Sequence, residues 1–372
     1  MNSVLDLLQA LVRIPSVNPD GDPDVSPEGE RKMAEFVGTF LEPLGFQVTL
    51  EDCELGRPNI IARAPGNNAR PRILLGPHLD TVSIKGMTVD PFAADISDGK
   101  VWGRGTSDTK GPMAAMLWGL KENAHCLADL PVAVDFVGFA GEESRQPGSR
   151  HFAKEHGSEY EFAIVGEPTS MEAVFCTKGC LWATIESKGQ ATHASQPHLG
   201  ENAILKLNAA LAALMSDFLP VIQENHHPVL NSPTLNIGKI SGGMRPNIVP
   251  DHAEAIIDIR TVPEIVSTQS AEVLLTEFLK DLDVSLQSAS EFPPMEMAKD
   301  QPWLSRLCEI HPELKLAGAP WFSDAAHLSA AGLPSICLGP GSIDQAHTAD
   351  EFIKISDLEA GAAWFSKLIA EL

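Results

Sequence analysis

Short apolar runs alternate with helical patterns along much of the chain. The runs are rich in Val and Ile, as strands buried on both faces require, and they occupy residues 73–75, 132–139, 162–165 and 336–338. Between them, apolar residues recur every three or four positions, which predicts helices over 30–42, 112–124, 148–156 and 355–372. This alternation is typical of an α/β domain with a mostly parallel sheet. The polar segment 67–70 predicts a hairpin turn.

The pattern changes near Lys178, where apolar and polar residues begin to alternate within strands. Such strands are predicted over 181–188, 234–240, 253–260 and 284–288, with helices over 201–215 and 267–282. Alternation of this kind is typical of a sheet that is covered on one face. Because the α/β pattern resumes after Phe292, we predict that an α+β domain at 179–290 is inserted into a domain formed by 1–178 and 291–372.

Composition narrows the class of protein. The length of 372 residues suggests two domains that each bury a core. Hydrophobic residues make up 44% of the chain and charged residues 21%, which argues against extensive disorder. The formal net charge is −23 and no run of Lys or Arg offsets it, so we expect no nucleic acid partner.

Neither export nor membrane insertion is predicted. The first residues lack the basic and apolar regions of a signal peptide, and no apolar run approaches the roughly 20 residues that span a bilayer. The six cysteines include no C-x-x-C pair, which argues against a disulfide framework or a zinc ribbon. We therefore expect a cytoplasmic protein that has no membrane partner.

Candidate chemistry first appears after the run at 73–75. His78 and Asp80 are two positions apart, so in an extended chain they face the same side. A carboxylate beside a metal-binding imidazole orients the ring. A single His at a strand end is more often a hydrogen-bonded surface residue. This pair therefore indicates a metal site only in combination with the acidic residues that follow.

Two acidic positions further along fit a metal site. Asp108 lies in a glycine-rich turn that opens a predicted helix, where it could bridge two cations; alone, it would be interpreted as a helix N-cap. Glu142 and Glu143 follow the strand at 132–139. Because adjacent side chains diverge, one carboxylate can bind metal while the other accepts a proton. An acidic pair alone is usually a solvated turn.

Two further candidates complete the set. Glu167 follows the strand at 162–165, and His347 follows the strand at 336–338. Every candidate thus comes after an apolar strand or opens a helix, and in a mostly parallel sheet these positions converge at one carboxyl edge.

The residue types indicate the ions. Two histidines and three carboxylates without a thiolate suit zinc, cobalt or manganese. Two divalent cations against Asp108, Glu143 and Glu167 leave one net positive charge, which favours hydroxide over water between them. We therefore expect two divalent metal ions, with zinc as the first choice.

The order of these motifs resembles that of the co-catalytic zinc amidohydrolases, which include acetylornithine deacetylase, succinyl-diaminopimelate desuccinylase, aminoacylase and glutamate carboxypeptidase. The resemblance covers essentially the whole chain and rests on His78-Leu79-Asp80, Ser107-Asp108-Thr109-Lys110-Gly111, Gly141-Glu142-Glu143, Gly166-Glu167-Pro168-Thr169 and His347. It implies a zinc-peptidase-like catalytic domain with a central mixed sheet flanked by helices. It also implies that the inserted α+β domain serves as a lid and in dimerisation.

The resemblance assigns a role to each motif. The implied metal ligands are Asp108 between the two ions, His78 and Glu167 on one ion, and Glu143 and His347 on the other. Glu142 would be the general base and Asp80 would orient His78. The peptide bond between Asp108 and Thr109 would be cis.

The inserted domain and one late loop resemble substrate-binding segments of the family. His193, within Gly189 to Ser195, would steady the oxyanion in the active site of a partner subunit, which implies a homodimer joined through the inserted domain. The implied substrate contacts are Lys178, Asn247, Arg260, Gly339 and Gly341. A planar guanidinium suits a substrate carboxylate, which favours Arg260 as a donor.

The loop at 338–347 looks most like that of the acetylornithine deacetylases, so we expect cleavage of the amide bond of a small N-acyl amino acid. Dipeptidase, carboxypeptidase and desuccinylase activities remain alternatives, since Phe322-Ser323-Asp324-Ala325 lacks the Gly-Gly-Thr run of many relatives. An alternative of another class is a relative that binds an amino acid or peptide without cleaving it. The presence of Glu142 argues against that alternative.

Overall fold

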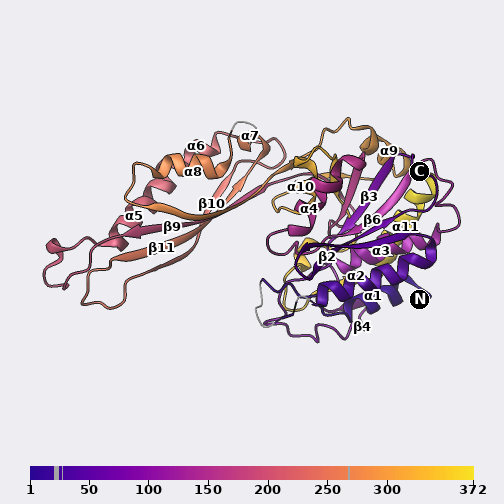
Figure 1. The fold of residues 1–372 in the computed structure, drawn as a ribbon, viewed down its shortest axis with the longest axis horizontal. Helices are drawn as coiled ribbons and strands as arrows, with labels where there is room; N and C mark the ends of the chain where they lie inside the picture. The colour runs from indigo at the N-terminus through magenta and orange to yellow at the C-terminus, as the bar shows by residue number, and fades with distance from the viewer. Residues whose placement is uncertain (21–24, 27, 267–268) are drawn as a thin grey trace. The chain divides into compact units, whose positions relative to one another are not determined.

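The chain divides into two compact units. The computed structural model describes residues 1–20, 25–26, 28–266 and 269–372. Unit 1 comprises Met1–Phe175, Met297–Ala317 and Ser323–Leu372, and unit 2 comprises Cys176–Glu296 and Gly318–Phe322 (Figure 1). The limits 179–290, predicted for an inserted domain, fall inside the longer segment of unit 2.

Unit 1 is built on a mixed sheet with the strand order β1-β2-β6-β3-β7-β15-β8. The strands are β1 Gln47–Glu54, β2 Arg57–Arg63, β3 Arg72–Pro77, β6 Ala133–Gly138, β7 Phe162–Gly166, β8 Ala173–Thr177 and β15 Ser335–Cys337. β3 runs parallel to β6 and β7, and β15 runs parallel to β7, whereas β1, β2 and β8 pair antiparallel. The predicted α/β class with a central mixed sheet is confirmed.

The central strands of this sheet are apolar because helices cover them. One group of helices packs around α3 and the other pairs α4 with α10. The bounds are α1 Val4–Val12, α2 Glu28–Leu41, α3 Lys110–Glu122, α4 Pro147–His156, α9 Pro302–Ile310, α10 Asp324–Ala330 and α11 Ile355–Glu371. In α11, Leu358, Ala362, Phe365 and Ile369 recur on one face and are buried, as the helical pattern predicts.

Smaller strands occur in both units. They are β4 Asp95–Ser97, β5 Lys100–Trp102, β13 Met295–Glu296, β14 Leu316–Ala319 and β16 Phe352–Lys354. β16, β5 and β4 form a separate sheet in that order. The predicted hairpin turn at 67–70 does contain a turn, but β2 and β3 are not paired, because β6 lies between them. The hairpin prediction is therefore wrong.

Unit 2 contains an antiparallel sheet with the order β10-β11-β9-β12. Its strands are β9 Gly179–Lys188, β10 Thr234–Gly242, β11 His252–Thr261 and β12 Ser285–Phe292, and its helices include α5 Ala203–Ala213, α6 Leu219–Gln223, α7 Pro263–Val266 and α8 Ala271–Leu279. Burial alternates along β11, as predicted for a sheet covered on one face. Residues 267 and 268, where a helix was predicted to begin, lie outside the described residues.

One helix of unit 2 corrects the prediction that no apolar stretch approaches the length of a membrane span. Among the described residues, Ala203–Gln223 forms a helix of 21 residues that is long and apolar enough to span a bilayer by length and composition alone. Its middle turns, Leu214–Phe218, are a π-helix. Leu207 and Leu211 are buried, and α5 packs against β9 and β11. Packing against the sheet accounts for these two side chains, whereas only 28% of the helix's 18-residue apolar window is buried.

Candidate metal centre

The ends of parallel strands bring the candidate metal ligands together. His78 directly follows β3, Glu167 directly follows β7, and Glu143 follows β6 after a short turn. Because these strands are parallel, their carboxyl ends lie at one edge of the sheet. Asp108 comes from the turn before α3, and His347 comes from the loop before β16.

Asp108 lies between the two histidines. His78 Nε2 is 3.0 Å from Asp108 Oδ1, and His347 Nε2 is 3.5 Å from Asp108 Oδ2. His347 Nε2 is also 2.9 Å from Glu143 Oε2. The peptide bond between Asp108 and Thr109 is cis, as the family resemblance predicts. Each oxygen of one carboxylate therefore faces a different imidazole.

Among the described residues, three overlapping triads place their ligand atoms within 4.8 Å of one another. These triads are His78, Asp108 and Glu167; Asp108, Glu143 and His347; and His78, Glu142 and Glu143. The first two match the ligand sets that the resemblance implies and share Asp108. The third includes Glu142, which the resemblance assigns to proton transfer.

The electrostatics of this cluster favour cations. Burial, followed by the nearby charge of Asp108, raises the pKa of Glu143 to about 7. Burial also raises the pKa of Glu167 well above its usual range. Within the described part of the chain, neither Glu143 Oε1 nor Glu167 Oε1 has a hydrogen-bond partner, although both atoms are buried. Crowded carboxylates without donors fit divalent ions, which would neutralise them.

The same carboxylates raise the pKa values of the two histidines. The hydrogen bond with Glu143 raises the pKa of His347 to about 9. Burial alone would lower the pKa of His78, but hydrogen bonds with Asp108 and Asp80 raise it. A site that stabilises positive charge at these nitrogens also suits a divalent metal ion, which would take the place of the protons there.

Asp80 fixes two parts of the cluster at once. Its Oδ1 accepts a hydrogen bond from the Glu142 backbone N, and its Oδ2 accepts one from the Glu143 backbone N, both at 3.0 Å. His78 Nδ1 lies 3.0 Å from the Asp80 carbonyl oxygen and 3.3 Å from Oδ1. Asn18 Nδ2 donates to Asp80 Oδ2 at 2.7 Å. Asp80 thus orients the imidazole and the acidic turn together.

The sequence-based prediction missed several residues that support the site, three of them around Asp80 and the acidic turn. Gln146 Nε2 donates to Glu142 Oε1 at 2.7 Å, and Glu30 Oε1 accepts from the Gly141 backbone N at 2.9 Å. Asn18, which binds Asp80, is the third. Gln146 follows Glu142 by four residues, so a search of the turn for side-chain donors could have found it. Asn18 and Glu30 are distant in sequence and carry no local signal.

The loop after β15 lies against the loop that carries Glu167. The Gly339 N donates to Thr169 Oγ1 at 3.2 Å, and the Ser170 N donates to the Gly341 carbonyl at 2.8 Å. Gly341 has a φ of +92°, and a Cβ there would come within 2.6 Å of Ser107 Oγ. Both glycines predicted to contact substrate therefore border the candidate metal centre in unit 1.

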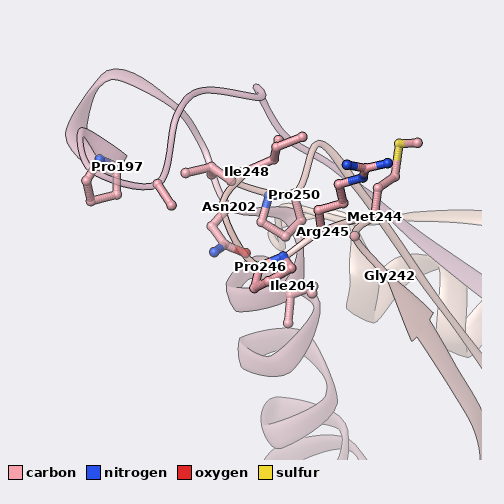
Figure 2. A pocket seen from close by; sticks show the side chains of 12 residues that line it. Pro197, Asn202, Ile204, Gly242, Met244, Arg245, Pro246, Ile248 and Pro250 are labelled. Atoms are coloured by element: carbon pink, nitrogen blue, oxygen red, sulfur yellow. The ribbon is translucent and has the colours of Figure 1, made fainter.

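The other predicted substrate residues lie in unit 2. His193 is exposed, with Nδ1 at 2.7 Å from Ser195 Oγ. The Asn247 carbonyl accepts a hydrogen bond from the Ala194 N at 3.1 Å. Beside them is a pocket of about 510 Å³, lined by residues between 194 and 204 and between 242 and 250 (Figure 2).

The two predicted cationic contacts have partners within unit 2. Arg260 binds Asp258 through Nε at 2.8 Å and Nη2 at 3.0 Å, and its guanidinium lies 5.3 Å from the centre of the Phe322 ring. Lys178 Nζ donates to the Ser232 carbonyl at 2.7 Å. The roles of these side chains in binding substrate remain predictions.

Comparison with known proteins agrees with this geometry. Residues 74–371 match the peptidase family M20/M25/M40. An acetylornithine deacetylase of Aliivibrio salmonicida is 30% identical, over 92% of each chain. An M20 metallo-carboxypeptidase of Sulfolobus solfataricus has a TM-score of 0.80 at 19% identity, over 99% of each chain. A Bacillus subtilis protein described as a dinuclear metal-binding M20 peptidase has a TM-score of 0.67 at 15% identity, over 98% of this chain and 96% of the other.

Proposed function

Because the chain belongs to the peptidase family M20/M25/M40, we propose that it hydrolyses the amide bond of a small N-acyl amino acid, with N-acetylornithine as the expected substrate. The observation that carries this proposal is the position of Asp108 between His78 and His347, with Glu142 and Glu143 in the same cluster. The similarity to acetylornithine deacetylases over almost the whole chain supports the choice of substrate.

Two divalent ions, zinc first and cobalt or manganese as alternatives, would be held by the first two triads. The proposed ligands are His78, Asp108, Glu143, Glu167 and His347. When bound, such ions supply Lewis acidity toward a carbonyl oxygen and a water molecule. The buried, unpartnered oxygens of Glu143 and Glu167 support this assignment.

Glu142 would move the proton. Its carboxylate accepts a hydrogen bond from Gln146 Nε2, and its backbone N is held by Asp80, so its position is fixed from two sides. It takes a proton from the attacking water as the water oxygen bonds to the acyl carbon. As the C–N bond breaks, Glu142 returns that proton to the leaving amine nitrogen. The products are a carboxylic acid and a free amine.

Five predicted residues would contact the substrate. Gly339 and Gly341 would offer backbone donors, while Arg260, Asn247 and Lys178 would bind the amino acid part of the substrate. The donor set of Arg260, which already binds the carboxylate of Asp258, is suited to a substrate carboxylate.

His193 would steady the oxyanion from a partner subunit, within a homodimer joined through unit 2. Its exposed ring is available to a second chain. We also propose a cytoplasmic location, since Cys180 and Cys337 are buried cysteines outside any disulfide, which suits a reducing compartment.

The deciding experiment measures amine release by purified protein loaded with zinc or cobalt, with metal-stripped protein as the control. The panel contains N-acetyl, N-succinyl and N-formyl amino acids together with dipeptides. Metal-dependent turnover of N-acetylornithine supports the proposal, and a preference for N-succinyl substrates or dipeptides reassigns the substrate class. No turnover on any compound would favour a protein that binds amino acids or peptides without cleaving them.

A further inference from the structure

The side chain of Glu351 lies fully buried beneath the loop that carries Asp108. Its Oε1 accepts hydrogen bonds from the backbone N atoms of Ser107 at 2.9 Å and Asp108 at 3.0 Å. Its Oε2 accepts hydrogen bonds from the backbone N of Gly105 at 2.9 Å and from Arg104 Nη1 at 2.8 Å. Each oxygen therefore accepts two hydrogen bonds, and three of the donors belong to the backbone of the metal-site loop.

Arg104 extends this contact to the loop that carries His347. Its side chain is 3% exposed, and its Nη2 donates to the Thr348 carbonyl at 3.2 Å. The backbone of Glu351 is itself held by a hydrogen bond from the Gly103 N to its carbonyl at 3.0 Å. Arg104, which is paired with Glu351, thus ties the peptide that follows His347 to the Asp108 loop.

This connection matters because His347 has an unusual backbone conformation. Its φ is +62°, in the left-handed region that residues other than glycine rarely occupy. Such a conformation persists only where the surrounding contacts hold it. The bond from Arg104 to the Thr348 carbonyl is one such contact, on the residue directly after the predicted ligand.

We propose that Glu351 is a positioning residue that sets Asp108 directly, and His347 through Arg104, for metal binding. The inference rests on the proposed function, because it takes these two residues as ligands. Glu351 lies outside the three triads, so it acts through the loops rather than as a ligand. Outer residues that orient metal ligands typically contribute about ten- to a hundredfold to metal affinity.

The chemistry requires a carboxylate of this length. A glutamine at position 351 would present an NH₂ group to two of the four donors, which would leave them buried without an acceptor. An aspartate would keep the charge but would be one methylene too short to meet all four donors. Glu351→Gln should therefore weaken metal binding strongly, and Glu351→Asp should weaken it less.

The test measures Zn²⁺ affinity of the full-length apoprotein by competition with a chromophoric zinc chelator, alongside thermal unfolding of the same apoprotein. We expect Glu351→Gln to lower zinc affinity about ten- to a hundredfold. Excess zinc should restore part of its amidohydrolase activity. Arg104→Lys keeps a cation beside Glu351 but removes the second guanidinium nitrogen, which binds the Thr348 carbonyl. We therefore expect this variant to weaken only one of the two zinc-binding steps.

Asp135→Asn is the matched control. Asp135 is a fully buried carboxylate of unit 1 that accepts a backbone hydrogen bond from Ala64 and bonds from Arg63 and Arg72, but it holds no predicted ligand loop. We expect this variant to unfold at a lower temperature and to keep wild-type zinc affinity.

Wild-type zinc affinity in Glu351→Gln, with lowered stability alone, would overturn the positioning role. If Glu351→Gln does not fold, the zinc affinity of Glu351→Asp is measured instead, and wild-type affinity in that variant would likewise overturn the positioning role. If wild-type protein binds zinc but cleaves no amide, only the proposed activity is rejected, and the comparison of zinc affinities between variants remains valid. Wild-type protein that binds no zinc defeats both proposals.

Discussion

The carboxylate of Asp80 holds the backbone of Glu142, with 3.0 Å between Asp80 Oδ1 and the Glu142 N. The other oxygen holds the next residue, Glu143, in the same way. One side chain thus sets the directions of two neighbouring acids that are proposed to have different tasks. If the turn were not rigid, Glu142 could not be kept for proton transfer while Glu143 binds metal.

Asp80→Asn should lower kcat/KM for the best substrate about ten- to a hundredfold. An amide has a single acceptor oxygen, so one of the two backbone N–H groups of the acidic turn would lose its partner. Steady-state kinetics on zinc-loaded protein measures the effect. Asp90→Asn is the control, since exposed Asp90 also accepts two backbone hydrogen bonds, from Phe92 and Ala93, in a turn without predicted ligands. Equal losses in both variants would contradict the prediction.

Glu142→Gln should lower kcat by about a hundredfold to ten-thousandfold while zinc content stays at the wild-type level. The variant removes the proton acceptor but leaves the two proposed ligand triads complete. Metal analysis after gel filtration and single-turnover kinetics measure the two effects separately. Glu143→Gln, which alters a proposed ligand, should lose zinc. Loss of zinc from Glu142→Gln would instead favour the third triad, with His78 and Glu143, as a metal site.

Arg57→Met should destabilise unit 1 by about 3–5 kcal/mol, because it leaves a buried carboxylate without its cation. Arg57 Nη2 donates to Glu30 Oε1 at 2.9 Å, and the side chains of Arg57 and Glu30 are 5% and 0% exposed. Urea unfolding measures the change. The control is Arg31→Ala, which breaks an exposed pair with Asp52 and should cost about 0–1 kcal/mol. Similar losses for the two variants would show that burial is not the cause.

His327 should make the protein less stable below neutral pH. Burial, together with the charge of Arg150, lowers its pKa from 6.5 to about 3 in the folded state. The unfolded chain therefore binds an extra proton first, so this contribution to stability is complete above pH 6.5 and is lost as the pH falls toward 3. The expected slope is roughly 1 kcal/mol per pH unit in this window. His327→Gln should remove it, and urea unfolding curves with the same pH dependence in both proteins would refute the assignment.

The sequence predicts four core strands of unit 1, β3, β6, β7 and β15, because each is a short apolar run that is buried on both faces. It misses β2 and β8, although both are buried along nearly all of their length. It does not predict where those strands lie in the sheet. Between β2 and β3 the chain makes a short turn at 67–70, yet β6 occupies the position between the two strands. Strand order is decided by contacts between distant residues, which no local pattern records. The edge strand β1 is half exposed, and its apolar signal is correspondingly weak.

The candidate metal centre follows a similar division. His78, Glu143 and Glu167 can be found in the sequence because each combines a suitable side chain with the end of an apolar strand. Glu30 and Glu351 cannot be found in this way, since an acidic residue in or before a helix is usually solvated. Their importance comes from backbone N–H groups far away in the sequence, such as those of Gly141 and Asp108, and only the fold brings these partners together.

The strand order has a consequence for how the chain is made. β15 pairs with β7 in the centre of the sheet, yet its residues 335–337 follow the whole of unit 2 in the sequence. During synthesis on the ribosome, the edge of β7 that will pair with β15 stays unpaired while unit 2 is made. An unpaired apolar edge is prone to aggregation. The segment that carries β15 and His347 is made after unit 2, and it then completes the pairing of β7. The proposed metal centre can therefore form only after unit 2 and the loop with His347 have been synthesised.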